Sequence, residues 1–143
     1  MTQHLRKIVE HDFAADGFRP HRDDGFLGHV GPIWERVDEE GVTLAFQATQ
    51  KHANLRGVVH GGMLMTLADR LLGMHGRMRN ENRSQATVQM DVHFFVPVRI
   101  GDVVTGRARI VQDTRSLFFI EGDLFVGDTR VFSARGVWKK LGE

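Results

Sequence analysis

Residues 54–73 read NLRGVVHGGMLMTLADRLLG, and this stretch carries the strongest structural signal in the chain. Its hydrophobic pattern changes from the alternation of strands to the spacing of a helix, which predicts a helix over about residues 61–79. The apolar residues on one face of this helix are Met63, Leu67, Leu71, Met74 and Met78. The sequence predicts no second long helix, so this apolar face must pack against strands.

Strand-like segments flank the helix on both sides. Before it, residues 26–37 and 42–49 predict a hairpin with the turn DEEG, where Gly41 would supply a positive φ. After it, residues 87–96 alternate between apolar and polar side chains, and Pro97 ends this strand or places it at a sheet edge. Three further strands are expected at about residues 102–112, 116–126 and 130–139. This order predicts an α+β fold, with one antiparallel β-sheet wrapped around one long central helix.

Length and composition indicate a single domain that covers residues 1–143. The first residues, MTQHLRKIVEHDFAADG, mix both charges and predict a short amphipathic helix, so residues 1–25 would form an N-terminal helix and loop. The 19 basic and 18 acidic residues nearly balance, so the chain has no overall positive electrostatic field that would attract nucleic acid. No apolar run approaches the ~18 residues that span a membrane, so no membrane partner is expected. The chain has no cysteine, which fits a reducing compartment such as the cytoplasm.

Asp69 interrupts the apolar sequence of the predicted helix. A buried and unpaired carboxylate costs several kcal/mol, so this side chain must be hydrated, paired or used in chemistry. The small residues on the same side of the helix are Gly62, Thr66, Gly73 and Gly76. A row of small residues leaves room beside the carboxylate and predicts that Asp69 faces a cleft. An ion pair with Arg70 or Arg77 explains the helical spacing equally well.

The sequence HGG, residues 60–62, immediately precedes the helical pattern. Free backbone N–H groups at a helix N-terminus, together with the helix dipole, stabilise an oxygen that becomes negative during a reaction. The same residues also suit a simple helix cap followed by flexible glycines. The sequence has neither a GxSxG elbow nor a cysteine nucleophile, so a serine or cysteine hydrolase is not indicated. Its eight histidines lack the spacing of a metal site, and no metal or other cofactor is predicted.

These motifs resemble the hotdog-fold acyl-CoA thioesterases of the phenylacetic acid degradation type. In that family an asparagine stands six positions before the histidine of HGG, and an aspartate follows this histidine by nine, as Asn54, His60 and Asp69 do here. The tetrapeptide TLAD, residues 66–69, and the sequence VPVRIGD, residues 96–102, are also similar to the family pattern. The resemblance covers nearly everything after about residue 26, and it implies the hotdog fold, in which the sheet wraps around the central helix.

The resemblance also implies a role for each residue of the site. Gly61 would donate its backbone N–H to the thioester carbonyl of an acyl-CoA substrate, while Asp69 attacks that carbonyl or activates water. Asn54 would orient the water or the carbonyl, and His60 would hold the turn and form a hydrogen bond near the site. Thr87, on the polar side of its strand, would assist the water. Family members assemble each site across a dimer interface, and many pair two dimers, so a homodimer or homotetramer is implied.

Two other functions stay open on the sequence. A hotdog-fold enoyl-CoA hydratase or dehydratase would move water across a carbon–carbon double bond, although its hallmark histidine and proline-rich signatures are absent here. A non-catalytic acyl-CoA-binding protein would keep the fold without turnover, whereas the presence of Asp69 within the whole motif favours turnover. The sequence does not identify the acyl group.

Overall fold

Helix α2 occupies Gly61–Arg79 in the computed structural model, which describes residues 7–142. These bounds confirm the predicted helix. Its first turn is capped by His60, whose Nδ1 accepts a hydrogen bond from the Gly62 N–H at 2.8 Å. After the last turn, Glu81 and Asn82 adopt positive φ angles of 54° and 60°, which reverse the chain so that it can enter the sheet. Neither α2 nor any other helix of the described residues is long and apolar enough to cross a membrane.

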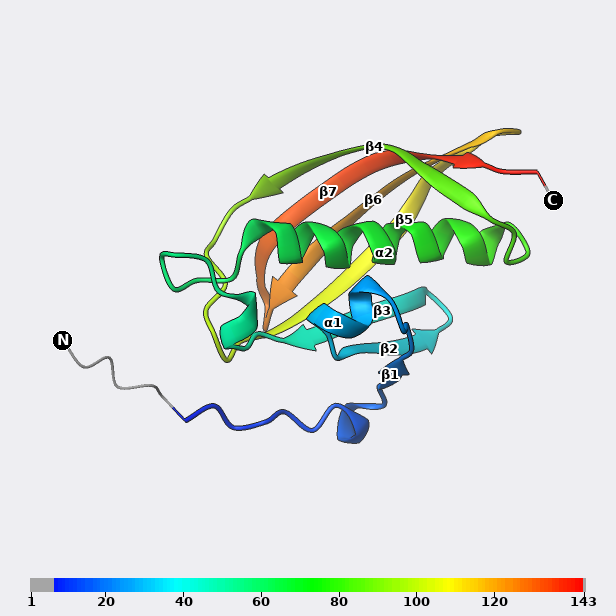
Figure 1. The fold of residues 1–143 in the computed structure, drawn as a ribbon. Helices are drawn as coiled ribbons and strands as arrows, with labels where there is room; N and C mark the ends of the chain where they lie inside the picture. The colour runs from blue at the N-terminus through cyan, green and yellow to red at the C-terminus, as the bar shows by residue number, and fades with distance from the viewer. Residues whose placement is uncertain (1–6, 143) are drawn as a thin grey trace.

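Seven antiparallel strands form one sheet that curves around α2 (Figure 1). They are β1 (Arg19–His21), β2 (Ile33–Asp38), β3 (Gly41–Gln47), β4 (Gln85–Phe94), β5 (Val103–Asp113), β6 (Leu117–Val126) and β7 (Thr129–Lys140). Their order across the sheet is β1-β2-β3-β5-β6-β7-β4, so β4 lies at one edge and, among the described strands, pairs only with β7. Figure 1 shows α2 lying between β4 and the β2–β3 hairpin. The predicted α+β architecture, the hotdog fold, is therefore confirmed.

The amphipathic helix predicted at the N-terminus is not present in the part that the structure describes, and its first six residues lie outside that part. Residues 7–12 have no regular secondary structure, and only a short 3-10 helix, η1 (Ala14–Asp16), follows. The side chain of Gln47, in β3, accepts a hydrogen bond from the His11 N–H and donates one to the Val9 carbonyl, each at 2.9 Å. The backbone of this segment therefore bonds to β3 instead of to itself.

The start of the first predicted strand is also wrong. Residues 26–30 form a short helix, α1 (Phe26–Val30), and β2 begins only after the cis Gly31–Pro32 peptide bond. Just before α1, the Asp23 side chain accepts a hydrogen bond from the Gly25 N–H at 2.7 Å. Such a local side-chain bond favours a turn over a strand, and it starts the helix here.

The other strands lie where they were predicted, except that β4 (Gln85–Phe94) begins and ends two residues before its predicted range of 87–96. The β2–β3 hairpin turns at Gly41, whose φ is 119°, and β5, β6 and β7 match their predicted ranges closely. Pro97 follows the end of β4, which is an edge strand. The sequence did not indicate β1, because a strand of three residues is too short to show a period of two.

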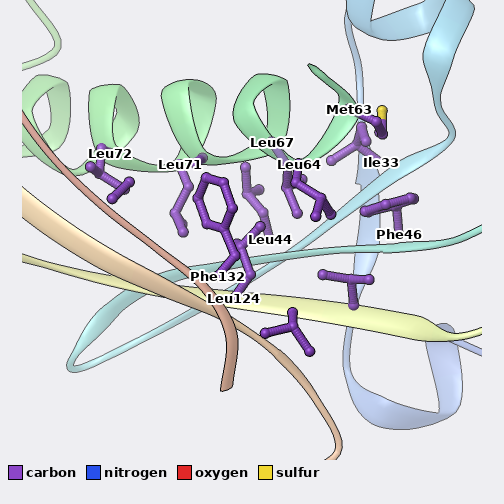
Figure 2. Packing of buried hydrophobic residues seen from close by; sticks show 14 of the residues in the cluster. Ile33, Leu44, Phe46, Met63, Leu64, Leu67, Leu71, Leu72, Leu124 and Phe132 are labelled. Atoms are coloured by element: carbon purple, nitrogen blue, oxygen red, sulfur yellow. The ribbon is translucent and has the colours of Figure 1, made fainter. Parts of the chain in front are cut away.

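The apolar face of α2 fills the space between the helix and the sheet (Figure 2). The central residues of this contact are Leu64, Leu67, Leu71 and Leu72 of α2 and Leu44, Leu124 and Phe132 of the sheet. Of the methionines on the predicted face, Met63 is buried and Met74 is half-buried, whereas Met78 in the last turn is 44% exposed. Each fully buried leucine contributes roughly 1.5–3 kcal/mol to stability, so α2 is held firmly on the sheet.

Candidate active site

Asp69 and Thr87 lie together between α2 and β4. Asp69 is half-buried on the side of α2 that faces away from the core leucines. Its Oδ1 accepts a hydrogen bond from Thr87 Oγ1 at 2.8 Å. The structure therefore joins two of the residues that the family resemblance placed in the site.

A β-bulge in β4 turns Thr87 toward the helix. In an uninterrupted strand Thr87, Gln89 and Asp91 would share one polar face, as the alternating sequence predicted. The pairing with β7 shifts between Thr87 and Gln89, so that one extra residue, Val88, is inserted. Thr87 consequently lies on the same side of β4 as Met90, which packs against the core. The prediction that Thr87 belongs to the polar face was wrong.

Asp69 is not held in an ion pair with Arg70. The Arg70 guanidinium instead donates from Nη2 to Asp23 Oδ2 at 2.8 Å and from Nε to His21 Nε2 at 3.0 Å. The ion pairs found within residues 7–142 include none between Asp69 and Arg77. The structural ion-pair explanation of Asp69 is therefore wrong, and no group of the described chain donates a hydrogen bond to Asp69 Oδ2.

A cavity of about 450 Å³ opens beside Asp69. Its walls come from α2, from the beginning of β4 and from Trp138 of β7, and His21 of β1 closes one side. The volume is many times the ~30 Å³ that one water molecule occupies in the liquid. Asp69 therefore faces a cleft, as the small residues beside it predicted.

His21 fixes one wall of this cavity through a chain of hydrogen bonds. Its Nδ1 lies 3.0 Å from Glu35 Oε1 and its Nε2 accepts from Arg70, so the neutral ring carries its proton on Nδ1. Burial acts to raise the pKa of the Glu35 carboxyl, but the hydrogen bonds from His21 and Arg19 and the charge of Arg19 outweigh it and hold that pKa below its ordinary value. The sequence did not point to His21, because its contact with Arg70 joins positions 49 residues apart.

The HGG turn presents one free donor at the start of α2. The Gly62 N–H is bonded to His60, whereas the Gly61 N–H has no acceptor within the described range 7–142. A Cβ at Gly61 would lie 3.0 Å from the ring of Phe94, so a larger residue would be crowded here. A free N–H at the positive end of a helix dipole can stabilise a developing oxyanion.

Asn54 shapes the loop that leads to this turn. Its Oδ1 accepts hydrogen bonds from the Arg56 N–H at 2.9 Å and from the Val58 N–H at 3.3 Å. The His60 N–H then donates to the His52 carbonyl at 2.7 Å, which fixes the exit of the loop. The Asn54 oxygen is thus occupied within its own loop, and only its amide N–H groups are left to contact water or a substrate.

Within one chain the two parts of the expected site lie apart. Gly61 and Asp69 are eight positions apart on α2, which corresponds to about 12 Å along the helix axis. One carbonyl group cannot contact both residues over that distance, since a hydrogen bond needs about 3 Å. The structure groups Asp69 with Thr87, whereas Gly61 begins α2 directly after His60 and the side chain of Asn54 bonds within the preceding loop.

A model of the thioesterase superfamily matches residues 56–133, which is more than half of the chain. The chain belongs to the thioesterase superfamily. This thioesterase is 32% identical over 128 residues to a Pseudomonas aeruginosa protein whose name classes it provisionally as an esterase, covering 87% of this chain and 96% of that protein. It is 26% identical over 136 residues to acyl-coenzyme A thioesterase 13 of Mus musculus, covering 95% and 92% of the two chains. A solved variant of phenylacetic acid degradation protein PaaI from Thermus thermophilus is similar with a TM-score of 0.75 and 22% identity, over 82% of this chain and 100% of that one.

Membership of this family makes the protein a thioester hydrolase. The solved variant of PaaI shares the fold of this chain. Membership of the phenylacetic acid degradation type stays a prediction. In the part of the chain that the structure describes, no group of three or more His, Cys, Asp or Glu side chains is placed to hold a metal ion. That the thioesterase works without a metal or other cofactor stays a prediction.

Proposed function

We propose that this thioesterase hydrolyses acyl-CoA to the free acid and CoA, with Asp69 as its catalytic carboxylate. The observation that carries the proposal is the Asp69–Thr87 pair beside the cavity of about 450 Å³. Asp69 is half-buried, has no ion-pair partner within residues 7–142 and keeps Oδ2 free of hydrogen bonds from them. Such a carboxylate in a cleft is a candidate for chemistry rather than for structure. The mouse relative, named an acyl-coenzyme A thioesterase, supports acyl-CoA as the substrate.

Two roles suit Asp69. As a general base it takes a proton from water while the water oxygen bonds to the carbonyl carbon. As a nucleophile its free Oδ2 forms that bond itself, and water then releases the acyl group from the enzyme. In both cases the carbonyl oxygen becomes negative, the carbon–sulfur bond breaks, and the sulfur leaves as the CoA thiolate. The Gly61 N–H would stabilise the negative oxygen.

Each site is proposed to contain residues from two copies of the chain. Gly61 and Asp69 of one chain are about 12 Å apart, whereas Gly61 of one copy can face Asp69 of another. The free edge of β4 offers a surface for this pairing. The large apolar residues exposed there, by 42% to 59%, are Val88, Phe94, Phe95 and Val96. An edge of this kind is normally covered, so a homodimer is the smallest complete enzyme and a homotetramer would hold two such dimers.

The remaining residues would support the oxyanion side of the site. His60 holds the HGG turn through its bond to the Gly62 N–H. The free amide N–H groups of Asn54 would orient the carbonyl or the attacking water, while Thr87 orients Asp69 from the other side. We expect the enzyme to act in the cytoplasm, since a chain without cysteine suits a reducing compartment.

Asp69→Asn tests the catalytic carboxylate. The variant keeps the shape of the side chain and can still accept a hydrogen bond from Thr87, but it loses the negative charge. The kcat should fall by roughly 100-fold or more. The measurement is release of the CoA thiol from a panel of short, medium, long and aromatic acyl-CoAs, with circular dichroism to verify folding. Asp24→Asn, at an exposed position outside the cavity, is the matched control and should keep the wild-type kcat. A folded Asp69→Asn protein with near wild-type kcat would reject the assignment.

The same assay separates hydrolysis from the two other functions. Thiol release is the expected result. A change in enoyl absorbance without thiol release would instead indicate a hydratase or dehydratase, and acyl-CoA binding without either signal would indicate a non-catalytic binding protein.

Gly61→Pro tests the backbone donor. Proline lacks the N–H but is favoured at the first position of a helix, and the extended backbone of His60, with φ −60° and ψ 132°, suits the residue before a proline. Gly61→Ala is the control, because it introduces the same contact with Phe94 but keeps the N–H. We expect Gly61→Pro to lower kcat by roughly 100-fold more than Gly61→Ala does.

Coexpression of Asp69→Asn and Gly61→Pro subunits tests whether the site is shared. In a mixed dimer with shared sites, one site carries both substitutions and the other carries neither. Random pairing should then restore about a quarter of the wild-type activity. If each site lay within one subunit, every site would carry a substitution and the mixture would stay inactive.

A further inference from the structure

We infer that the cavity beside Asp69 selects acyl groups that carry a hydroxyl at their far end, and that Trp138 and Gln85 bind this hydroxyl. The inference rests on the proposed function, because it assigns a substrate class to the same site. Both residues line the cavity, and each contributes one polar group that has no partner within residues 7–142.

Trp138 supplies a hydrogen-bond donor. It is among the largest fully buried side chains, with only 1% of its surface exposed. Its indole Nε1–H has no acceptor in the described part of the chain, and since this atom is not itself fully buried, it is left open to the cavity that Trp138 lines. Trp138 is the direct cross-strand partner of Thr87, which bonds to Asp69. The free donor therefore lies next to the proposed catalytic pair.

Gln85 supplies the complementary acceptor. Its Nε2 donates to the Gly73 carbonyl at 2.7 Å, which identifies Nε2 as the nitrogen and Oε1 as the oxygen of the amide. The other amide atom, Oε1, is buried and has no hydrogen-bond partner among the residues described. It packs close to Gly76, where a Cβ would lie 2.6 Å from it. A ligand reaches Oε1 when the terminal amide rotates away from the Gly73 carbonyl, about a torsion with a broad minimum.

The Gln85 amide and the Trp138 indole both lie against Gly73 of α2. A Cβ at Gly73 would lie 3.5 Å from Trp138 Nε1 and 3.5 Å from Gln85 Nε2, the nitrogen of the amide that carries Oε1. Gly73 is one turn beyond Asp69, which corresponds to about 6 Å along the axis. A substrate group at this place is therefore several bonds away from the thioester that Asp69 attacks.

A hydroxyl is the smallest group that satisfies both residues. Its oxygen accepts the Trp138 N–H, and its own hydrogen is donated to Gln85 Oε1. A ketone oxygen would satisfy only the donor, an ammonium group only the acceptor, and an alkyl end neither. Because a polar site without its partner group loses hydrogen bonds to water, an alkyl chain of equal length should be a poorer substrate.

The test compares 6-hydroxyhexanoyl-CoA with heptanoyl-CoA, in which a methyl group replaces the hydroxyl. For the wild-type homo-oligomer we expect kcat/KM to be roughly 10-fold or more higher for the hydroxylated substrate. Trp138→Phe removes the donor and Gln85→Met removes the acceptor, and each should bring the ratio close to one. Met74→Leu, at an apolar position of the same cavity, is the control and should leave the ratio unchanged.

The ratio is independent of the fraction of folded enzyme, because both substrates are measured on the same preparation. A role of Trp138 or Gln85 in structure alone would lower both rates and leave the ratio unchanged, which would overturn the inference. Equal wild-type kcat/KM values for the two substrates would also overturn the inference, and this is the result expected if the cavity binds the CoA part that both substrates share. The proposed hydrolysis would stand in that case. No thiol release from either substrate would overturn the proposed function and this inference together.

Discussion

The Thr87 hydroxyl orients the Asp69 carboxylate through one hydrogen bond of 2.8 Å, a normal length for an O–H···O bond. A hydrogen bond to a charged group contributes about 1.5–3 kcal/mol, and the low end applies here because Thr87 is exposed and water can take its place. Valine has the same shape but no hydroxyl. For Thr87→Val we therefore expect kcat to fall roughly 10-fold, since about 1.4 kcal/mol corresponds to that factor. Thiol release at saturating acyl-CoA is the measurement.

Two further variants make this prediction specific. Thr87→Ser keeps the hydroxyl and should retain most of the activity. Thr66→Val removes a hydroxyl that bonds to the Gly62 carbonyl within α2, at the same 2.8 Å, and should leave kcat near wild type. The stability of Thr87→Val should change by less than about 0.5 kcal/mol, because its side chain is exposed. Wild-type kcat in a folded Thr87→Val enzyme would show that the hydrogen bond does not support catalysis.

Two other predictions concern stability. Burial lowers the pKa of His52 below its ordinary 6.5, only partly offset by its bond to the Val30 carbonyl, so the unfolded chain binds this proton more readily than the folded one. As the pH is lowered past about 6.5, the free energy of unfolding should therefore decrease, by up to ~1.4 kcal/mol per pH unit. Urea denaturation of His52→Gln should lack this pH-dependent component. Equal pH slopes for the wild type and His52→Gln would contradict the assignment. A Cβ at Gly136 would lie 2.4 Å from the Gln89 carbonyl oxygen, so Gly136→Ala should lower stability by about 1–3 kcal/mol. Thermal unfolding is the measurement, and Gly142→Ala, with no atom within 4 Å, should have no effect.

The sequence predicted the parts of the fold that depend on local periodicity. The bounds of α2 and of β5 to β7 follow from hydrophobic spacing over ten or more residues, which is long enough to separate a period of 3.6 from one of two. Short elements could not be predicted from hydrophobic spacing. The helix α1 was predicted as strand, and β1 was not predicted, because each has too few residues to show a period.

The site was predictable only where its residues belong to one continuous motif. The HGG turn and Asp69 lie within one segment, at the start and in the middle of the same helix, so their spacing could be read directly. The orientation of Thr87 could not, because it depends on a bulge created by the pairing of β4 with β7. The contact between His21 and Arg70 could also not be predicted, since it arises only when the chain folds.

The cavity beside Asp69 is built from segments that lie far apart in the sequence. His21 of β1 and Trp138 of β7, which form two of its walls, lie outside the helix α2 that carries Asp69 and Gly61. A substitution at either wall position therefore changes the shape of the cavity without changing the residues proposed to break the thioester. After gene duplication, substitutions at these two wall positions would give copies that share one reaction but consume different metabolites. Sorting relatives by the motif alone would group such copies together, whereas sorting them by positions 21 and 138 would separate them by the metabolite that each consumes.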